Sequence, residues 1–187
     1  LKKENQTGPE PKPRYQVIKK GDYIMTQSER RILPEDVIPQ KYKLFLEPNL
    51  DTFTFDGEVE ISVEIINKTD RITLNAAELT IFSTSIQIGE NTILGDSLES
   101  ADDETITIDL GEQYSPCQAT VKIKFSGELN DRLLGFYRSQ YLDTNGETKY
   151  LAATQFESTD ARRAFPCWDE PERKATFDVT LKIAQDL

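Results

Sequence analysis

The feature that most constrains the fold is an alternation of apolar and polar side chains that recurs along most of the chain. Its clearest copy is residues 58–65, which read Glu-Val-Glu-Ile-Ser-Val-Glu-Ile. A period of two places one side of an extended strand in a core and the other side in water, whereas an amphipathic helix needs a period near 3.6. Further copies lie at 42–46, 106–110, 121–125 and 177–183. We therefore expect an all-β protein of roughly nine short strands without a long helix.

Turn signals separate these strands at short intervals. The Asn-Gly pair at 145–146 is a strong signal for a hairpin between segments 135–138 and 149–152. Residues 79–88 indicate one longer, bent strand, and we interpret the acidic run 102–104 as a solvated turn. Strands with one apolar face and short turns pack as antiparallel layers. The expected architecture is thus an antiparallel β-sandwich with a saddle-like shape.

The absence of histidine narrows the chemistry that this chain can perform. With no histidine among 187 residues, a histidine-ligated zinc or haem site, a Ser-His-Asp triad and a Cys-His pair are excluded within it. A net charge of −11 argues against a nucleic-acid surface, which needs clustered lysine and arginine. No apolar run reaches the roughly 18 residues that a membrane span needs. Cys117 and Cys167 allow one disulfide or two thiols, and we expect two free, partly buried thiols.

The chain divides by composition near residue 31. Residues 1–31 are polar, with several prolines and lysines, and we expect them to form a poorly ordered tail. Residues 32–187 carry the alternating pattern and are expected to form one β-domain. Domains of this length can bury a core of their own.

The stretch Thr154–Pro171 gathers more unusual residue types than any other and connects two expected strands. Loops that a rigid scaffold carries are frequent binding sites. Gln155 and Glu157 lie two residues apart in an extended segment, so both side chains should point to one side while Phe156 points into the core. A carboxylate beside an amide can bind an ammonium group through charge-assisted hydrogen bonds. Gln155 and Glu157 are therefore our candidate ligand-binding residues.

We interpret the residues that follow Glu157 in this stretch as structural support for Gln155 and Glu157. Arg162–Arg163 are expected to form ion pairs with Asp169–Glu170 rather than to bind an anion. Residues 159–164 are expected to form one helical turn, capped by Ser158 or Thr159. The aromatic residues here are interpreted as core residues; they are Phe165 and Trp168.

Beyond these patterns, the chain resembles the N-terminal domain of zinc aminopeptidases of the gluzincin class, and most of all the puromycin-sensitive type. The resemblance covers about residues 32–187. The motifs that carry it are Thr154–Pro171, Gly135–Ser139, Lys174–Asp178, Leu33–Pro39 with Tyr42, Phe53–Gly57 and Gly127–Asp131. Several motifs in the same order make the resemblance specific.

The resemblance implies a saddle-like β-domain that lies over a thermolysin-like catalytic domain. It implies an enzyme that removes single amino acids from peptide N-termini with a zinc ion held by two histidines and a glutamate. Glu157 matches the glutamate that binds the free amine of the substrate, and Gln155 matches the glutamine beside the pocket for the first side chain. The implied partners are a peptide N-terminus and the catalytic domain.

The chain departs from the complete family pattern because it has no His-Glu-x-x-His motif, no further zinc ligand and no Gly-Ala-Met-Glu-Asn segment. We therefore expect no catalytic residue and no bound metal here, zinc only in the parent enzyme, and an N-terminal fragment that is inactive alone. The alternative is a stand-alone, non-catalytic β-domain for peptide or protein binding. The free-thiol expectation, the missing membrane span and the resemblance together predict a cytoplasmic location.

Overall fold

The computed structural model describes residues 32–185, and the predicted tail 1–31 lies outside the described residues. Eleven strands and one short 3-10 helix, η1, make up the described chain. The elements are β1 (Val37–Asn49), β2 (Thr54–Ile65), β3 (Thr69–Asn75), β4 (Leu79–Ile88), β5 (Asn91–Gly95), β6 (Ser97–Ser100), β7 (Thr105–Tyr114), β8 (Cys117–Glu128), β9 (Gly135–Leu142), β10 (Thr148–Gln155), η1 (Ala161–Arg163) and β11 (Thr176–Leu181).

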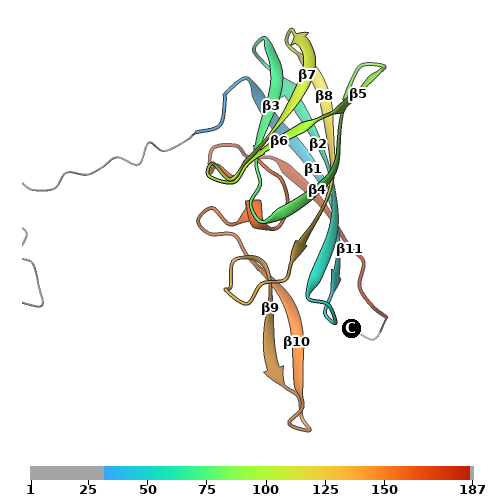
Figure 1. The fold of residues 1–187 in the computed structure, drawn as a ribbon, viewed down its shortest axis with the longest axis vertical. Coiled ribbons are helices and arrows are strands. Elements are labelled where there is room, and N and C mark those ends of the chain that lie inside the picture. The colour runs from blue at the N-terminus through green and yellow to red at the C-terminus, as the bar shows by residue number, and fades with distance from the viewer. Residues whose placement is uncertain (1–31, 186–187) are drawn as a thin grey trace, which may run out of the picture. The chain divides into compact units, whose positions relative to one another are not determined.

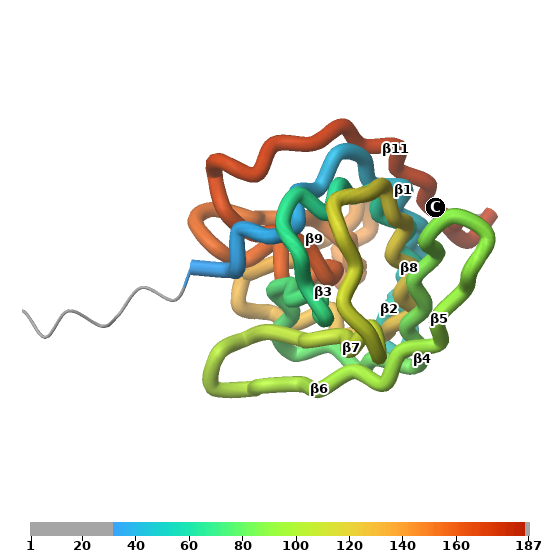
Figure 2. Tube along the Cα trace, turned by 90° about the horizontal axis from the view of Figure 1, so that it is seen from above, coloured from blue at the N-terminus to red at the C-terminus, as the bar shows by residue number. Residues whose placement is uncertain are grey.

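The strands form three sheets. The largest has the order β11-β1-β2-β8-β4-β5, a second has the order β3-β7-β6, and β9 pairs with β10 alone. In Figure 1 the three-stranded sheet lies beside the upper part of the six-stranded sheet, and the β9–β10 hairpin extends from the lower end. Figure 2 shows the same arrangement from above, with β3 and β7 on one side and β4, β5 and β8 on the other. The prediction of an all-β fold with antiparallel sheets is confirmed.

The alternating sequence pattern produces the core between the two larger sheets. The apolar residues of segment 58–65 in β2 are all fully buried, as the pattern predicts. The residues that share this core with them, each at most 1% exposed, are Ile72, Leu74, Ile86, Ile106, Ile108, Val121, Ile123 and Phe125. Burying one such side chain contributes about 1.5–3 kcal/mol. This core is the rigid scaffold that carries the connection between β10 and β11, residues 156–175, which is called the connection below.

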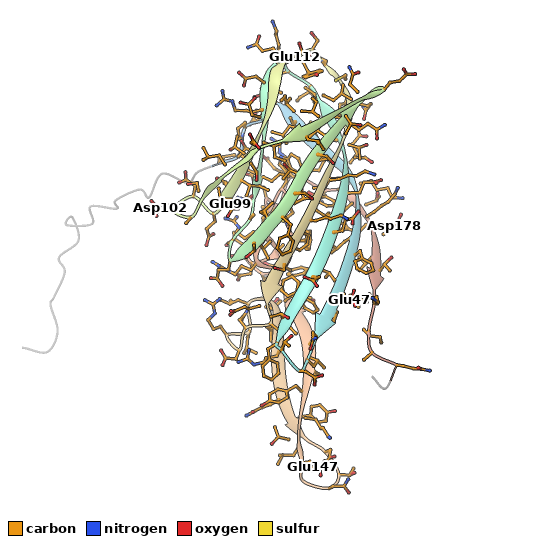
Figure 3. The ribbon with its side chains drawn as sticks, turned by 45° about the vertical axis from the view of Figure 1, so that its right-hand side comes forward. Glu47, Glu99, Asp102, Glu112, Glu147 and Asp178 are labelled. Atoms are coloured by element: carbon orange, nitrogen blue, oxygen red, sulfur yellow. The ribbon has the colours of Figure 1, made fainter. Side chains whose placement is uncertain are left out.

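The polar side of β2 faces solvent and is paired across the sheet. Glu60 lies 2.8 Å from Lys43 on β1 and 2.9 Å from Lys122 on β8. Hydrogen bonds from Lys43 and then Lys122 lower the pKa of Glu60. Acidic residues are also distributed over the rest of the domain: Figure 3 shows Glu112 at one end and Glu147 at the tip of the opposite hairpin. The negative charge is thus spread over the surface.

Two short strands and one strand direction differ from the sequence prediction. The count of roughly nine strands was too low because β5 and β6 are short edge strands whose side chains are mostly exposed, so they lack a clear alternation. The expectation of purely antiparallel pairing also needs a correction at β11. That strand pairs with β1 in parallel, with Tyr42 beside Phe177 and Leu44 beside Val179. The predicted bend in β4 is present as a register shift between Ile81 and Ser83.

The predicted Asn-Gly hairpin joins β9 and β10. The Asp143 carboxylate accepts hydrogen bonds from the backbone N–H groups of Asn145 and Glu147, both at 2.9 Å. Gly146 has a φ of +78°, which glycine adopts without strain. The last residue of β10, Gln155, pairs with Gly135 at the start of β9. The hairpin therefore determines the position of Gln155, after which the connection between β10 and β11 begins.

Candidate functional site

Gln155 and Glu157 lie side by side on the surface at the end of β10. Both are exposed, and the backbone N–H of Glu157 donates a hydrogen bond of 3.5 Å to the side-chain oxygen of Gln155. Within residues 32–185 no lysine or arginine forms an ion pair with the Glu157 carboxylate. The two predicted residues are thus adjacent and open to a ligand, although neither lines the apolar groove described below.

The expected orientation of Phe156 is wrong. Its side chain is 36% exposed rather than buried in the core. It contacts the edge of Phe165, with ring centroids 5.9 Å apart, at the border of an apolar surface. The reason is that β10 ends at Gln155, so the alternation of side chains does not continue as it would in a longer strand.

A tight turn follows Glu157 and leads into η1. The backbone N–H of Asp160 donates to the carbonyl of Phe156 at 3.0 Å, and that of Arg163 donates to the carbonyl of Asp160 at 3.1 Å. The predicted helical turn is therefore present, but the predicted caps are wrong. Asp160 occupies the N-cap position and makes no side-chain cap hydrogen bond, because its carboxylate binds the Nε of Arg163 at 3.0 Å instead.

Arg162 forms the ion pair that the sequence predicts with Asp169, but not one with Glu170. Its Nε lies 3.0 Å from Asp169, and its second contact, at 3.0 Å, is Glu104. Glu170 instead accepts a hydrogen bond of 2.8 Å from the backbone N–H of Leu33. Arg162 is only 13% exposed, so these contacts hold the connection against the body of the domain.

Arg163 is surrounded by three carboxylates. Besides Asp160, its guanidinium contacts Glu78 at 2.6 Å and Glu104 at 2.5 Å. Burial disfavours the charged guanidinium, but the hydrogen bond to Asp160 and the charges of Glu104 and Glu78 outweigh this, so the pKa of Arg163 is raised. The interpretation of Glu104 as part of a merely solvated turn is wrong, since it bridges both arginines. Sequence reasoning missed Glu78 and Glu104 because they are more than 50 residues away from the connection.

The last part of the connection is buried, as predicted. Phe165 and Trp168 are 4% and 5% exposed, and the backbone N–H of Trp168 donates to the Tyr42 hydroxyl at 3.1 Å. Cys167 pairs through its backbone with Asn75 in both directions, at 2.8 and 3.0 Å. Both cysteines are free thiols, as expected. Burial raises the pKa of the Cys167 thiol.

An apolar groove lies between this connection and the edge of the six-stranded sheet. Its volume is about 580 Å³, and it is lined by side chains of β1, β9, β10, β11 and the connection. Side chains of β11 remain about half exposed in it: Phe177 at 50%, Val179 at 59% and Leu181 at 56%. Phe177 stacks on Tyr42 at 4.6 Å. Contiguous apolar surface of this kind is typical of an interaction site.

The described residues do not fit a zinc site. Across residues 32–185 no group of three or more histidine, cysteine, aspartate or glutamate side chains is placed to hold a metal ion. The acids nearest the connection are engaged by arginines: Asp160, Glu78 and Glu104 by Arg163, and Asp169 by Arg162. No helix in the same described range is long and apolar enough to cross a membrane.

Comparison with known proteins assigns the domain. Residues 38–187 match the peptidase M1 N-terminal domain family. The chain belongs to this family. It is 47% identical over 158 residues to the puromycin-sensitive aminopeptidase of Caenorhabditis elegans, 41% identical over 160 residues to aminopeptidase M1 of Arabidopsis thaliana, and 45% identical over 156 residues to the alanine/arginine aminopeptidase of Saccharomyces cerevisiae. The resemblance seen in the sequence is thereby confirmed.

These matches cover most of this M1 N-terminal domain but a small part of the relatives. The alignments include 81–83% of this chain and only 17–18% of the length of the three relatives. The residues that match the family include nearly all of β1, all later strands and the connection between β10 and β11. It does not extend the relatives' activity to this chain by itself.

Proposed function

We propose that this chain is the N-terminal, substrate-binding domain of a zinc-dependent aminopeptidase, in which Glu157 and Gln155 receive the free amino end of a peptide. The observation that carries the proposal is an exposed Glu157 carboxylate that has no ion-pair partner among residues 32–185 and lies next to Gln155, in a peptidase M1 N-terminal domain. A carboxylate of this kind can bind an α-ammonium group by charge-assisted hydrogen bonds.

The selectivity for a peptide terminus would follow from charge. An internal residue of a peptide brings no ammonium group, so a carboxylate enclosed by substrate and protein would remain unpaired. Leaving a buried charge without its partner costs several kcal/mol, which is enough to discriminate strongly between substrates. The exposed position of Glu157 in this chain means that the enclosing surface has to come from elsewhere in the parent protein.

The remaining polypeptide of the parent enzyme would supply both that enclosure and the zinc site. The relatives are more than five times longer than their match to this chain, so they contain ample polypeptide for a catalytic domain. We propose that part of it covers the apolar groove beside Phe156 and β11. Zinc, when held by that domain, would supply the activated water, and the chain described here would contribute binding and orientation of the substrate. A cytoplasmic location stays a prediction.

Replacing Glu157 by glutamine in the complete enzyme tests the role of its charge. We expect Glu157→Gln to raise KM and to lower kcat/KM at least ~10-fold, equivalent to about 1.4 kcal/mol of lost binding. Glu90→Gln, at an exposed glutamate in the turn between β4 and β5, is the matched control and should leave both constants unchanged. Steady-state kinetics equal to those of the wild type would remove the assigned role of Glu157.

Gln155 is proposed to contact the first side chain of the substrate. Substituting it, for example Gln155→Ala, should alter the ranking of kcat/KM among peptides that differ only in their first residue. A uniform change for all first residues would contradict this role.

A stand-alone binding domain is the second candidate, favoured by the open apolar groove beside β11. Metal analysis and an aminopeptidase assay on the 187-residue chain alone do not separate the two candidates, because both predict neither zinc nor turnover. Identification of a defined peptide or protein partner for the isolated, monodisperse chain would favour the second candidate.

A further inference from the structure

We infer that Glu78 and Glu104 are positioning residues for the amine site, because they hold Arg163 and, through it, the turn that carries Glu157. This inference rests on the proposed function of Glu157. Neither glutamate would touch the substrate. Both lie in connections of the scaffold, Glu78 between β3 and β4 and Glu104 between β6 and β7.

A short series of direct contacts leads from these glutamates to Glu157. Arg163 uses all three guanidinium nitrogens: two contact Glu78 and Glu104, and Nε contacts Asp160 at 3.0 Å. Asp160 closes the turn 156–160 by its backbone hydrogen bond to Phe156, and Glu157 lies within that turn. Arg163 is only 17% exposed. Its charge-assisted hydrogen bonds restrain Asp160 and therefore the turn that Asp160 closes.

The backbone at both glutamates supports a specific role for their carboxylates. Glu78 has a φ of +57° and Glu104 a φ of +52°, in the left-handed region that favours glycine. A non-glycine residue there costs roughly 1–2 kcal/mol, and such strain is concentrated at functional positions. Both strained residues direct their carboxylates to the same guanidinium. The positive-φ positions thus coincide with two of the carboxylates that hold Arg163.

Further backbone contacts join the same region to the scaffold. Ala77, which precedes Glu78, donates to the carbonyl of Arg162 at 3.0 Å, and Ala76 donates to the carbonyl of Glu104 at 2.9 Å. These hydrogen bonds do not depend on the glutamate side chains. Substituting Glu78 or Glu104 by glutamine therefore keeps the backbone contacts and the left-handed residue while it removes only the negative charge.

A double-mutant cycle in the complete enzyme tests the inference. We expect Glu104→Gln, combined with Glu78→Gln, to raise KM for peptides about 10-fold with a much smaller change in kcat. In an enzyme that already carries Glu157→Gln, the same two substitutions should change KM by less than about 2-fold, because their effect acts through Glu157. Equal losses in both backgrounds would overturn the inference. Glu58→Gln, which removes an exposed ion pair with Lys124 on the outer sheet face, is the control.

Hydrogen exchange on the 187-residue chain provides an independent test. The double variant should accelerate exchange at the Asp160 N–H while amides in β2 and β8 keep their protection. A uniform acceleration throughout the domain would show a purely structural role and overturn the inference. The two proposals fail separately: an unchanged KM in Glu157→Gln refutes the amine site, whereas unchanged exchange at Asp160 refutes the positioning by Glu78 and Glu104.

Discussion

Glu157 and Glu104 are both glutamates in connections between strands, but their surroundings differ. Glu104 forms ion pairs with Arg162 and Arg163, whereas the one polar interaction of Glu157 within residues 32–185 is the hydrogen bond from its backbone N–H to Gln155. The first arrangement satisfies the carboxylate inside the domain. The second leaves a carboxylate to be satisfied by a ligand, which is the basis for assigning substrate binding to Glu157 and support to Glu104.

The aromatic residues of the connection should differ widely in their effect on stability. Phe165 is buried and contacts the rings of Tyr42, Phe156 and Phe177, so Phe165→Ala should lower the free energy of unfolding by about 3–5 kcal/mol. Phe156→Ala, the matched control at a 36% exposed ring, should cost about 1 kcal/mol or less. Urea unfolding of the 187-residue chain measures both values, and similar costs would contradict the described burial.

The two thiols should differ in reactivity. Because burial raises the pKa of Cys167, its thiol stays protonated and inaccessible near pH 8, whereas Cys117 is only partly buried. A thiol reagent should therefore label one cysteine per folded chain and two in denaturant. Rapid labelling of both in the folded state would argue against this packing. Replacing Cys117 by serine should abolish labelling of the folded chain.

At the scale of the elements, the alternating pattern predicts the long strands well because each has one face in the core. It fails at β5 and β6, whose side chains are mostly exposed, and it contains no information on the parallel direction of β11. For the candidate site, the neighbouring pairs were accessible to sequence reasoning: Gln155 beside Glu157, and Arg162 with Asp169. Glu78 and Glu104 were not, since only the fold brings them to Arg163.

Gly135 joins the hairpin to the connection and should not tolerate a side chain. Its φ is +66°, and an added Cβ would lie 2.6 Å from the Cβ of Arg163. Gly146 has a similar φ of +78° with nothing within 4 Å, so it serves as the control. Gly146→Ala should cost about 1–2 kcal/mol from backbone strain alone, and Gly135→Ala clearly more. Equal shifts of the thermal unfolding midpoint would contradict the close approach at Gly135.

For the molecule as a whole, the apolar groove lies beside β11, an edge strand of the six-stranded sheet whose apolar side chains are about half exposed. An exposed edge strand with apolar side chains promotes association with other strands. We expect the isolated chain to self-associate, and Val179→Lys to reduce this. Sedimentation velocity over a range of concentrations measures it. A stable monomer at high concentration would favour the stand-alone domain.

We propose above that Glu157 recognises the α-ammonium group of a peptide. Inhibition of the complete enzyme by two peptides that are identical except that one lacks the α-amino group tests this role. We expect the wild type to bind the amine at least ~10-fold more tightly than its des-amino analogue, and Glu157→Gln to bind the two nearly equally. If Glu157→Gln keeps the wild-type preference for the amine, the claim is wrong.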